Sequence, residues 1–504
     1  MKDGAQWSIP AHGEYSMANV ARRDCLKGVA ALALAQAAHP LLAKYPEKIK
    51  GAELPHARTA LADRHFTSAA VEALIPRIQK GIADPALSVI FENCFPNTLD
   101  TTVYPGSFEG HPDTYVVTGD IDAMWLRDSS AQVWPYLPLA KDDPKLRQLL
   151  EGLIRRQARM ILIDPYANAF TRIPSSPPLS WAVKDLTDHY PGVAERKWEI
   201  DSLCYPIRLA HGYWKATGDT APFDATWQQA ALTILRTFRA QQRKHDHGPY
   251  TFQRESAIPG DTLPLGGYGN PAVSVGLIYS MFRPSDDACI YPFLIPANHF
   301  AVTSLRQLAD IATHVLNNPK LAADAESLAA EVERALAQYG KTHHPKFGEI
   351  WAYEVDGYGN ALMMDDADAP GLMSMPYLGA CTIDDPLYLR TRRFVLSDSN
   401  PYFSSGTAGQ GVGSPHEGID TIWPMSIAYR ALTTTDEQEI RLCLRTLRDT
   451  TAGTGFMHES FHKDDASKFT RPWFAWANTL FGELIVKLAA DHPSLLSVPI
   501  PSVP

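Results

Sequence analysis

The chain has 504 residues, of which 45% are hydrophobic and 20% charged, so it can bury a large core. Its formal net charge of −10 argues against nucleic acid or an anionic membrane as a partner, because phosphate contacts need a surface rich in Lys and Arg. After the N-terminal region, no segment is apolar for long enough to cross a bilayer, so stable membrane insertion is not expected.

The N-terminal region has the pattern of an export signal. The pair Arg22-Arg23 precedes a Leu-Lys step and a weakly apolar run over residues 28–35, which resembles a twin-arginine signal. A basic N-terminal helix is the alternative interpretation. We predict an export signal and linker over residues 1–44, export by the twin-arginine machinery, and a periplasmic or secreted protein.

The rest of the chain is dominated by helix signals. A strand pattern over 114–118 is followed by a helix that begins at Asp143-Pro144, a capping acid before a proline at the first helical position. Further segments with helical spacing of apolar residues, and one more strand pattern over 350–355, follow in chain order. The later helical segments are 227–238, 318–340, 440–447 and 474–488.

This pattern indicates many antiparallel helices with a few local strands in the loops. No sequence repeat and no low-complexity linker divides the chain. We therefore predict one catalytic domain over residues 45–495, followed by a frayed C-terminal tail over 496–504.

The cysteines do not form a recognisable framework. None of them is part of a CxxC pair, so neither a zinc ribbon nor a redox motif is indicated. Loss of the first one with the export signal would leave an odd number, and we expect isolated, mainly buried thiols. The six are Cys25, Cys94, Cys204, Cys289, Cys381 and Cys443.

The first motif with chemical potential is TGDIDAMWLRDS, residues 118–129. Carboxylates and a guanidinium can each bind two adjacent sugar hydroxyls, and an indole can stack on a sugar ring. A salt-bridged turn is the alternative, which explains the charges but not the tryptophan between them. The candidate residues are Asp122, Trp125, Arg127 and Asp128.

Two further motifs place acids near the starts of elements. In WEIDSLCYP, Glu199 and Asp201 lie where a loop enters a helix, and a capping role for Asp201 is the alternative to function. In FRPSDDACIYPF, Asp286 and Asp287 lie in an otherwise apolar run that also contains Arg283. Burial disfavours a charged carboxylate, so such an acid keeps its proton, as a general acid must. Helix capping is again the alternative.

The last two motifs are GQGVGSPHEG, residues 409–418, and FMHESFH, residues 456–462. The first predicts a tight loop that presents His416 and Glu417, because no Lys-Ser/Thr follows to complete a phosphate loop. The second formally matches the His-Glu-x-x-His signature of zinc peptidases, which requires a helix. A nearby glycine and a charged run do not support that helix. The alternative makes Glu459 a carboxylate on a loop.

Together these strings resemble glycoside hydrolase family 125. The strings are TGDIDAMWLRDS, WEIDSLCYP, FRPSDDACIYPFLIPAN, YEVDGYGNALMMDDA, GVGSPHEGIDTIWP and FMHESF…FTRPWFAWANTLFGELI, and they extend from about residue 90 to 490. The resemblance implies an all-α fold, an (α/α)6 barrel with a few short strands in the loops. It also implies an exo-acting α-1,6-mannosidase that inverts the anomeric carbon, with no metal and no cofactor.

Carried over by motif, the resemblance places the general acid at Asp286, with Asp287 as the other possibility, and the general base at Glu459. Asp122, Trp125, Arg127 and Asp128 would bind the terminal sugar of an α-mannoside glycan. The further binding candidates are Arg283, Asp287 and His416.

For an inverting enzyme the two catalytic carboxyls should lie about 6.5–9.5 Å apart, which leaves room for the attacking water. Three alternatives stay open at this point. The chain could be a glucoamylase-like barrel glycosidase, a zinc peptidase that uses the His-Glu-x-x-His motif, or a sugar-binding protein without catalysis.

Overall fold

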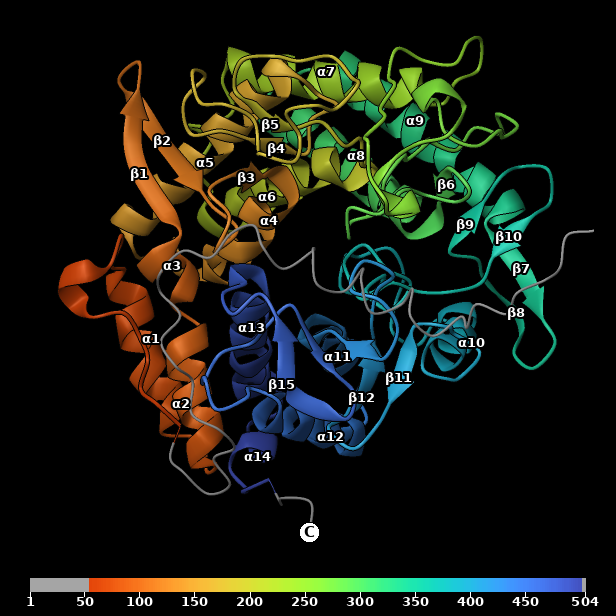
Figure 1. Ribbon diagram of the computed structural model, residues 1–504. Coiled ribbons are helices and arrows are strands. Elements are labelled where there is room, and N and C mark those ends of the chain that lie inside the picture. Colours follow the sequence, from red (N-terminus) through yellow and green to blue (C-terminus); the bar gives the residue numbers. More distant parts are fainter. Residues whose placement is uncertain (1–53, 501–504) are drawn as a thin grey trace, which may run out of the picture. The chain divides into compact units, whose positions relative to one another are not determined.

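The computed structural model describes residues 54–500, and helices make up most of its regular structure (Figure 1). The predicted export signal lies outside the described residues. The α-helices are α1 (Ala69–Gln79), α2 (Pro85–Cys94), α3 (Asn97–Thr101), α4 (Leu126–Val133), α5 (Pro144–Ile163), α6 (Ile200–Thr217), α7 (Ala225–Ala240), α8 (Ile295–His314), α9 (Pro319–Tyr339), α10 (Pro386–Val395), α11 (Pro424–Leu432), α12 (Glu437–Asp449), α13 (Ala475–Asp491) and α14 (Pro493–Leu496).

The long helices begin where the sequence predicts. Asp143 accepts hydrogen bonds from the backbone N–H groups at the start of α5, and Asn318 does the same for α9. Each cap is followed by a proline whose missing N–H would have no partner in the first turn. The predicted apolar face of α5 is buried, and α9 ends at Gly340 as expected. These boundaries depend only on local sequence, so the sequence alone predicted them.

The helices form an inner series that is covered by an outer one. Within the inner series, α13 packs on α4, α4 on α6, and α6 on α8, while α11 packs on α13. The outer helices pack on the inner ones, with α5 on α6, α9 on α8 and α12 on α11, and α5 also packs on its outer neighbour α7. Helices that follow one another in sequence therefore alternate between the two series, and Figure 1 shows this for α8 with α9 and α11 with α12.

The strands are short and form small antiparallel sheets of two or three strands. Several of them lead directly into an inner helix: β3 precedes α4, β5 precedes α6, β6 precedes α8, and β13 precedes α11. The strands are β1 (Val103–Phe108), β2 (His111–Val116), β3 (Met124–Trp125), β4 (Ala169–Phe170), β5 (Val193–Glu195), β6 (Phe293–Leu294), β7 (Lys341–His344), β8 (Gly348–Trp351), β9 (Glu354–Val355), β10 (Ala361–Leu362), β11 (Phe403–Ser405), β12 (Gln410–Val412), β13 (Thr421–Ile422), β14 (Ser460–His462) and β15 (Asp465–Thr470).

The predicted strand over 350–355 is two strands in different sheets. The backbone N–H of Ala352 donates to the carbonyl of Gly340, and that of Tyr353 donates to the carbonyl of Leu362. The chain therefore changes its pairing partner in the middle of the apolar run, so that β8 pairs with β7 while β9 pairs with β6 and β10.

The C-terminal residues are better packed than the predicted frayed tail, as far as the structure describes them. Leu496 is 3% exposed and Ile500 is 5% exposed. Arg448 Nη1 donates a hydrogen bond of 2.6 Å to the carbonyl of Ile500, which holds this segment against α12. A proline-rich composition does not by itself prevent a segment from docking through apolar side chains.

The prediction of isolated thiols is confirmed for the described residues. Within residues 54–500, five cysteines are present as free thiols and four of them are buried, as expected of isolated cysteines. No helix in that range combines the length and apolar character that a bilayer crossing requires.

Candidate active site

The site residues come from loops at the N-terminal ends of the inner helices. Arg127 and Asp128 lie in the first turn of α4, and Asp201 lies in the first turn of α6. Glu459 directly precedes β14, and Arg471 follows β15 just before α13. Because the inner helices pack side by side, segments that are distant in sequence meet at this end of the fold.

These segments line a cavity of about 640 Å³, which is within the range of about 300–1,000 Å³ typical of small-ligand sites. The cavity brings together six of the predicted site residues. They are Trp125, Arg127, Asp128, Asp286, His416 and Glu459.

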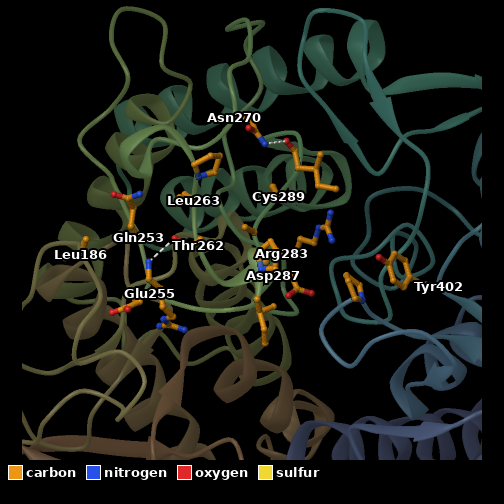
Figure 2. Close-up of a pocket in the computed structure, with 18 residues that line it drawn as sticks. Leu186, Gln253, Glu255, Thr262, Leu263, Asn270, Arg283, Asp287, Cys289 and Tyr402 are labelled. Atoms are coloured by element: carbon orange, nitrogen blue, oxygen red, sulfur yellow. Dashed lines mark hydrogen bonds between the residues drawn. The ribbon is translucent and has the colours of Figure 1, made fainter. Parts of the chain in front are cut away.

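Three of the predicted binding residues lie elsewhere. The side chain of Asp122 is 73% exposed and pairs with Arg172 at 3.2 Å, so it does not line this cavity. Arg283 and Asp287 line a neighbouring cavity of about 860 Å³, which Figure 2 shows. We call the first the catalytic cavity and the neighbouring one the second cavity.

Asp286 and Asp287 belong to one tight turn that begins at Arg283. The backbone N–H of Asp286 donates to the carbonyl of Arg283, and that of Arg283 donates to the carbonyl of Asp287. Asp286 has a φ of 69°, in the left-handed region that residues other than glycine seldom adopt. As a result two consecutive carboxylates line two different cavities. The alternative that these acids cap a helix is wrong, because the next helix, α8, starts only at Ile295.

The surroundings of Asp286 are more polar than the sequence suggests. Its Oδ1 accepts a hydrogen bond of 3.3 Å from Asn168, and its backbone carbonyl accepts one of 2.7 Å from Lys197 Nζ. Burial favours the neutral acid, but the charges of Lys197, Arg127 and His416 outweigh it and lower the pKa of Asp286. The expectation that apolar neighbours alone keep this acid protonated is therefore wrong.

The carboxyl next to Asp286, that of Glu199, has its pKa shifted in the opposite direction. Burial raises the pKa of Glu199 well above its usual value, against the charge of Arg127, and the neighbouring Asp286 raises it further. The two carboxyls interact side chain to side chain. Two carboxyls in contact do not both ionise readily, so the pair holds one proton.

Arg127 joins the first two sequence motifs. Its Nη1 donates to Glu199 Oε2 at 2.5 Å and to Asp201 Oδ2 at 3.1 Å, and both carboxylates are fully buried. Asp201 therefore pairs with Arg127, and the alternative that it caps α6 is wrong, since Glu199 occupies the N-cap position. Near this cluster the buried atoms Trp125 Nε1 and Asp128 Oδ2 make no hydrogen bond, and Asp128 Oδ2 forms an ion pair of 3.5 Å with Arg127 Nε. Both residues line the catalytic cavity, so these atoms are available to sugar hydroxyls.

Glu459 is held by a separate set of hydrogen bonds. Its Oε1 accepts a hydrogen bond of 3.2 Å from Arg471 Nη1, and its Oε2 accepts one of 3.3 Å from Thr470. The residue is 5% exposed. The carboxylate is thus held in one orientation while it still lines the cavity.

The loop between β12 and β13 adds His416 and Glu417. Although burial opposes it, the carboxylates of Asp287, Glu459 and Asp286 raise the pKa of His416 to about 10, so this imidazole is a cation at neutral pH. Burial, and then the charge of Glu459, raise the pKa of Glu417 to about 7. Asp287 Oδ1 lies 3.7 Å from His416 Nδ1, which places this ion pair between the two cavities.

The zinc-peptidase alternative does not fit the local structure. Residues 460–462 form the strand β14, and a His-Glu-x-x-His motif needs a helix to put both histidines on one face. The ring of His458 stacks on Phe469 with centroids 3.7 Å apart, and His462 Nδ1 accepts from the backbone N–H of Asp464. Both imidazoles are thus engaged in contacts within this hairpin.

Some site residues were not singled out from the sequence. Lys197 and Asp368 line the catalytic cavity, and so does Trp181, which is itself half-exposed. Glu417 also lines it, and the tight loop that presents His416 and Glu417 had already suggested that residue. Lys197 opens the second motif, next to Trp198 and Glu199, and only the fold shows that it reaches Asp286.

Comparisons with known proteins agree on one family. The family model for metal-independent α-mannosidases (GH125) matches residues 84–486. The Meiotically up-regulated gene 157 protein of Schizosaccharomyces pombe is 42% identical over 460 residues, which cover 88% of this chain and 90% of that protein.

A solved structure from Streptococcus pneumoniae is also similar. It is 41% identical, with a TM-score of 0.81, and the match covers 85% of this chain and 100% of that chain. That structure is described as a metal-independent α-mannosidase in a non-productive substrate complex with α-1,6-mannobiose.

Proposed function

The chain belongs to the GH125 family of metal-independent α-mannosidases, and on this premise we propose that it is an exo-acting hydrolase of terminal α-1,6-linked mannose that inverts the anomeric carbon. The observation that carries the proposal is that Asp286 and Glu459 line one cavity together with Trp125, Arg127 and Asp128. The α-1,6-mannobiose bound by the S. pneumoniae relative supports the linkage.

The proposed fold is an (α/α)6 barrel. The alternation of inner and outer helices along the chain supports it, as does the position of the cavity at the N-terminal ends of the inner helices. The likeness to the S. pneumoniae structure, which covers 85% of this chain, also supports it.

In the proposed mechanism Asp286 is the general acid. The pair of Glu199 and Asp286 holds one proton, and transfer of that proton within the pair leaves Asp286 able to protonate the departing glycosidic oxygen. Lys197 and Arg127 then stabilise the carboxylate that remains. The proton that reaches the glycosidic oxygen therefore comes from Glu199 and passes through Asp286.

Glu459 is the proposed general base. It takes a proton from a water that attacks the anomeric carbon from the face opposite to the leaving group, in a single displacement. Arg471 and Thr470 hold its two oxygens, so the carboxylate presents a fixed edge to that water. Glu459 accepts a proton while Asp286 gives one up, so the two carboxyls have the opposite roles that this chemistry requires.

The sugar-binding groups surround these carboxyls. Trp125 and Asp128 offer atoms that make no hydrogen bond within the protein to the hydroxyls of the terminal mannose, and Arg127 and His416 add positive charge. The buried pairing of Arg127 with Glu199 and Asp201 keeps the guanidinium in place.

The proposal is tested by product analysis on a panel of substrates. We expect mannose release from α-1,6-mannobiose, much slower release from α-1,2- and α-1,3-mannobiose, none from glucose disaccharides, and no change with a chelator. The Glu459→Gln variant should lose turnover by at least a thousandfold, in line with removal of a general base and its water. Glu326→Gln, at a half-exposed position on α9, is the matched control.

Release of glucose instead of mannose would favour the glucoamylase-like alternative. Full activity of Glu459→Gln would reject the assigned base. Binding of the sugar with no hydrolysis in the unmodified protein would favour a lectin-like role.

We also propose that the protein is exported in its folded state through the twin-arginine pathway. The support is the Arg22-Arg23 pair and the weakly apolar run that follows it. Fractionation of cells that express the full chain should place it outside the cytoplasm, and the double substitution Arg22→Lys, Arg23→Lys should retain it inside. Export of the double variant at an unchanged level would contradict this route.

A further inference from the structure

The second cavity lies directly beside the catalytic cavity. It has a volume of about 860 Å³. Three residues of one exposed segment, Arg254, Glu255 and Ile258, line both cavities and form a common ridge. A ligand that extends out of the catalytic cavity over this ridge therefore enters the second one.

Two buried polar atoms in the lining of the second cavity have no hydrogen-bond partner. They are Nη2 of Arg283, which is 3% exposed, and Oδ2 of Asp287, which is 6% exposed. Each side chain is anchored by another atom, because Arg283 Nε donates to Glu354 at 2.6 Å and Asp287 Oδ1 faces His416 at 3.7 Å. A buried donor or acceptor without a partner is costly, so two of them in one cavity indicate a ligand.

The chemistry of the lining favours a neutral ligand with hydroxyl groups. One free atom is a donor and the other an acceptor, which matches a hydroxyl group in both of its roles. The charged residues of the lining are balanced, with Arg254 and Arg283 against Glu255 and Asp287. Two carboxylates would repel an anion and two guanidinium groups would repel a cation, whereas a neutral sugar is repelled by neither.

The walls of the cavity add apolar surface that suits the C–H faces of sugar rings. Leu186, Ile258 and Ile290 are exposed at 68%, 60% and 48% and belong to the lining. Figure 2 shows Tyr402 on the side of the cavity away from Gln253 and Glu255, with its hydroxyl directed toward Arg283. The second cavity thus combines polar anchors in its floor with apolar contacts at its rim.

We propose that the second cavity binds further sugar residues of the leaving glycan, so that the enzyme recognises a chain longer than a disaccharide. This inference rests on the proposed function, because it assumes that a glycan departs from the catalytic cavity. Arg283 and Asp287 then recognise the glycan and take no part in bond cleavage. Both residues belong to the same hydrogen-bonded turn as Asp286, so the glycan is recognised directly beside the general acid.

The experiment compares kcat/KM on α-1,6-mannobiose and on linear α-1,6-mannotetraose. We expect the unmodified enzyme to prefer the tetraose by about tenfold, the equivalent of 1.4 kcal/mol. Tyr402→Phe removes one hydroxyl from the lining, and Ile290→Trp fills the mouth of the cavity. Both variants should lower the ratio of kcat/KM on the tetraose to kcat/KM on mannobiose toward one. The kcat/KM on mannobiose should stay unchanged. Ile173→Trp, at an exposed position that lines neither cavity, is the matched control.

Equal kcat/KM on both substrates in the unmodified enzyme would overturn the inference. So would a change in kcat/KM with Ile290→Trp that is the same for both substrates. Calorimetric binding of mannotetraose to the Glu459→Gln protein separates this result from a failure of the proposed function. Binding that Ile290→Trp weakens about tenfold supports the second cavity even if no substrate is cleaved. Binding that Ile290→Trp leaves unchanged overturns it.

Discussion

Arg471 Nη1 donates a hydrogen bond of 3.2 Å to Oε1 of Glu459. The same guanidinium donates from Nε and Nη2 to Asp120 Oδ1, at 2.9 and 2.6 Å. Arg471 is therefore clamped between two carboxylates, and its planar fork fixes the direction of Glu459. The orientation of the proposed base thus depends on Arg471, which follows β15, and on Asp120, which precedes β3.

Replacement of Arg471 by Lys should lower kcat far more than it changes KM. A lysine keeps the charge but loses the fork, so Glu459 can rotate away from the attacking water, and a misplacement of about 1 Å can reduce the rate about a hundredfold. Steady-state kinetics on α-1,6-mannobiose measures this split. Arg172→Lys changes an exposed arginine paired with Asp122 and should stay within about twofold of the unmodified enzyme. A variant Arg471→Lys with normal kcat would show that this contact does not position the base.

The leaving group distinguishes the two neighbouring aspartates. Asp286→Asn should nearly abolish hydrolysis of mannobiose but retain much of the activity on 2,4-dinitrophenyl α-mannoside, because this leaving group departs without a proton. Asp287→Asn should affect both substrates alike, since Asp287 lines the second cavity. If instead only Asp287→Asn loses activity on mannobiose and keeps it on the activated substrate, the general acid is Asp287.

Glu417 should set the alkaline limb of the pH profile. Its pKa of about 7 means that it is neutral below pH 7, where it can donate a hydrogen bond to Glu459, and charged above pH 7, where it repels the same carboxylate. Activity should therefore fall as the pH rises through about 7. In Glu417→Gln this fall should move to higher pH, as seen in kcat/KM measured from pH 5 to 9. Identical profiles for the two proteins would contradict the role of Glu417.

Glu483 should make the fold less stable as the pH rises. Burial raises its pKa to about 7, although Arg208 and the hydroxyl of Tyr377 oppose the shift. The folded protein then holds a proton that the unfolded chain releases near pH 4.5, so stability decreases between about pH 4.5 and 7 and stays lower above that range. Glu483→Gln should relieve this loss.

Thermal unfolding at pH 4.5 and at pH 8 measures the effect. The gain in Tm of Glu483→Gln over the unmodified protein should be larger at pH 8 than at pH 4.5, by about 2 °C. Glu326→Gln, at a half-exposed position, should show the same small difference at both pH values. A gain for Glu483→Gln that does not depend on pH would mean that burial does not hold its proton.

The sequence predicted those features whose cause is local. The starts of α5 and α9 follow from Asp143 and Asn318, which cap the helices through the backbone a few residues away. The strings around Arg127, Asp286 and Glu459 also carry the family resemblance, and the structure brings these three residues into one cavity.

Features that depend on contacts between distant segments could not be predicted in this way. The pairing of Arg127 with Glu199 and Asp201 joins two motifs that share no local signal. The turn at Asp286 sends adjacent carboxylates into different cavities because of one left-handed residue. Asp122 shows the opposite case, since its motif predicted a binding residue and the fold directs it to solvent.

The stereochemistry of the first product tests the central claim most directly. Proton NMR of α-1,6-mannobiose hydrolysis, recorded before the released mannose mutarotates, reports the anomer that the enzyme forms. A single displacement between Asp286 and Glu459 predicts β-mannose as the initial product. Initial α-mannose would mean retention through a covalent intermediate, and it would contradict the role of Glu459 as a base acting on water.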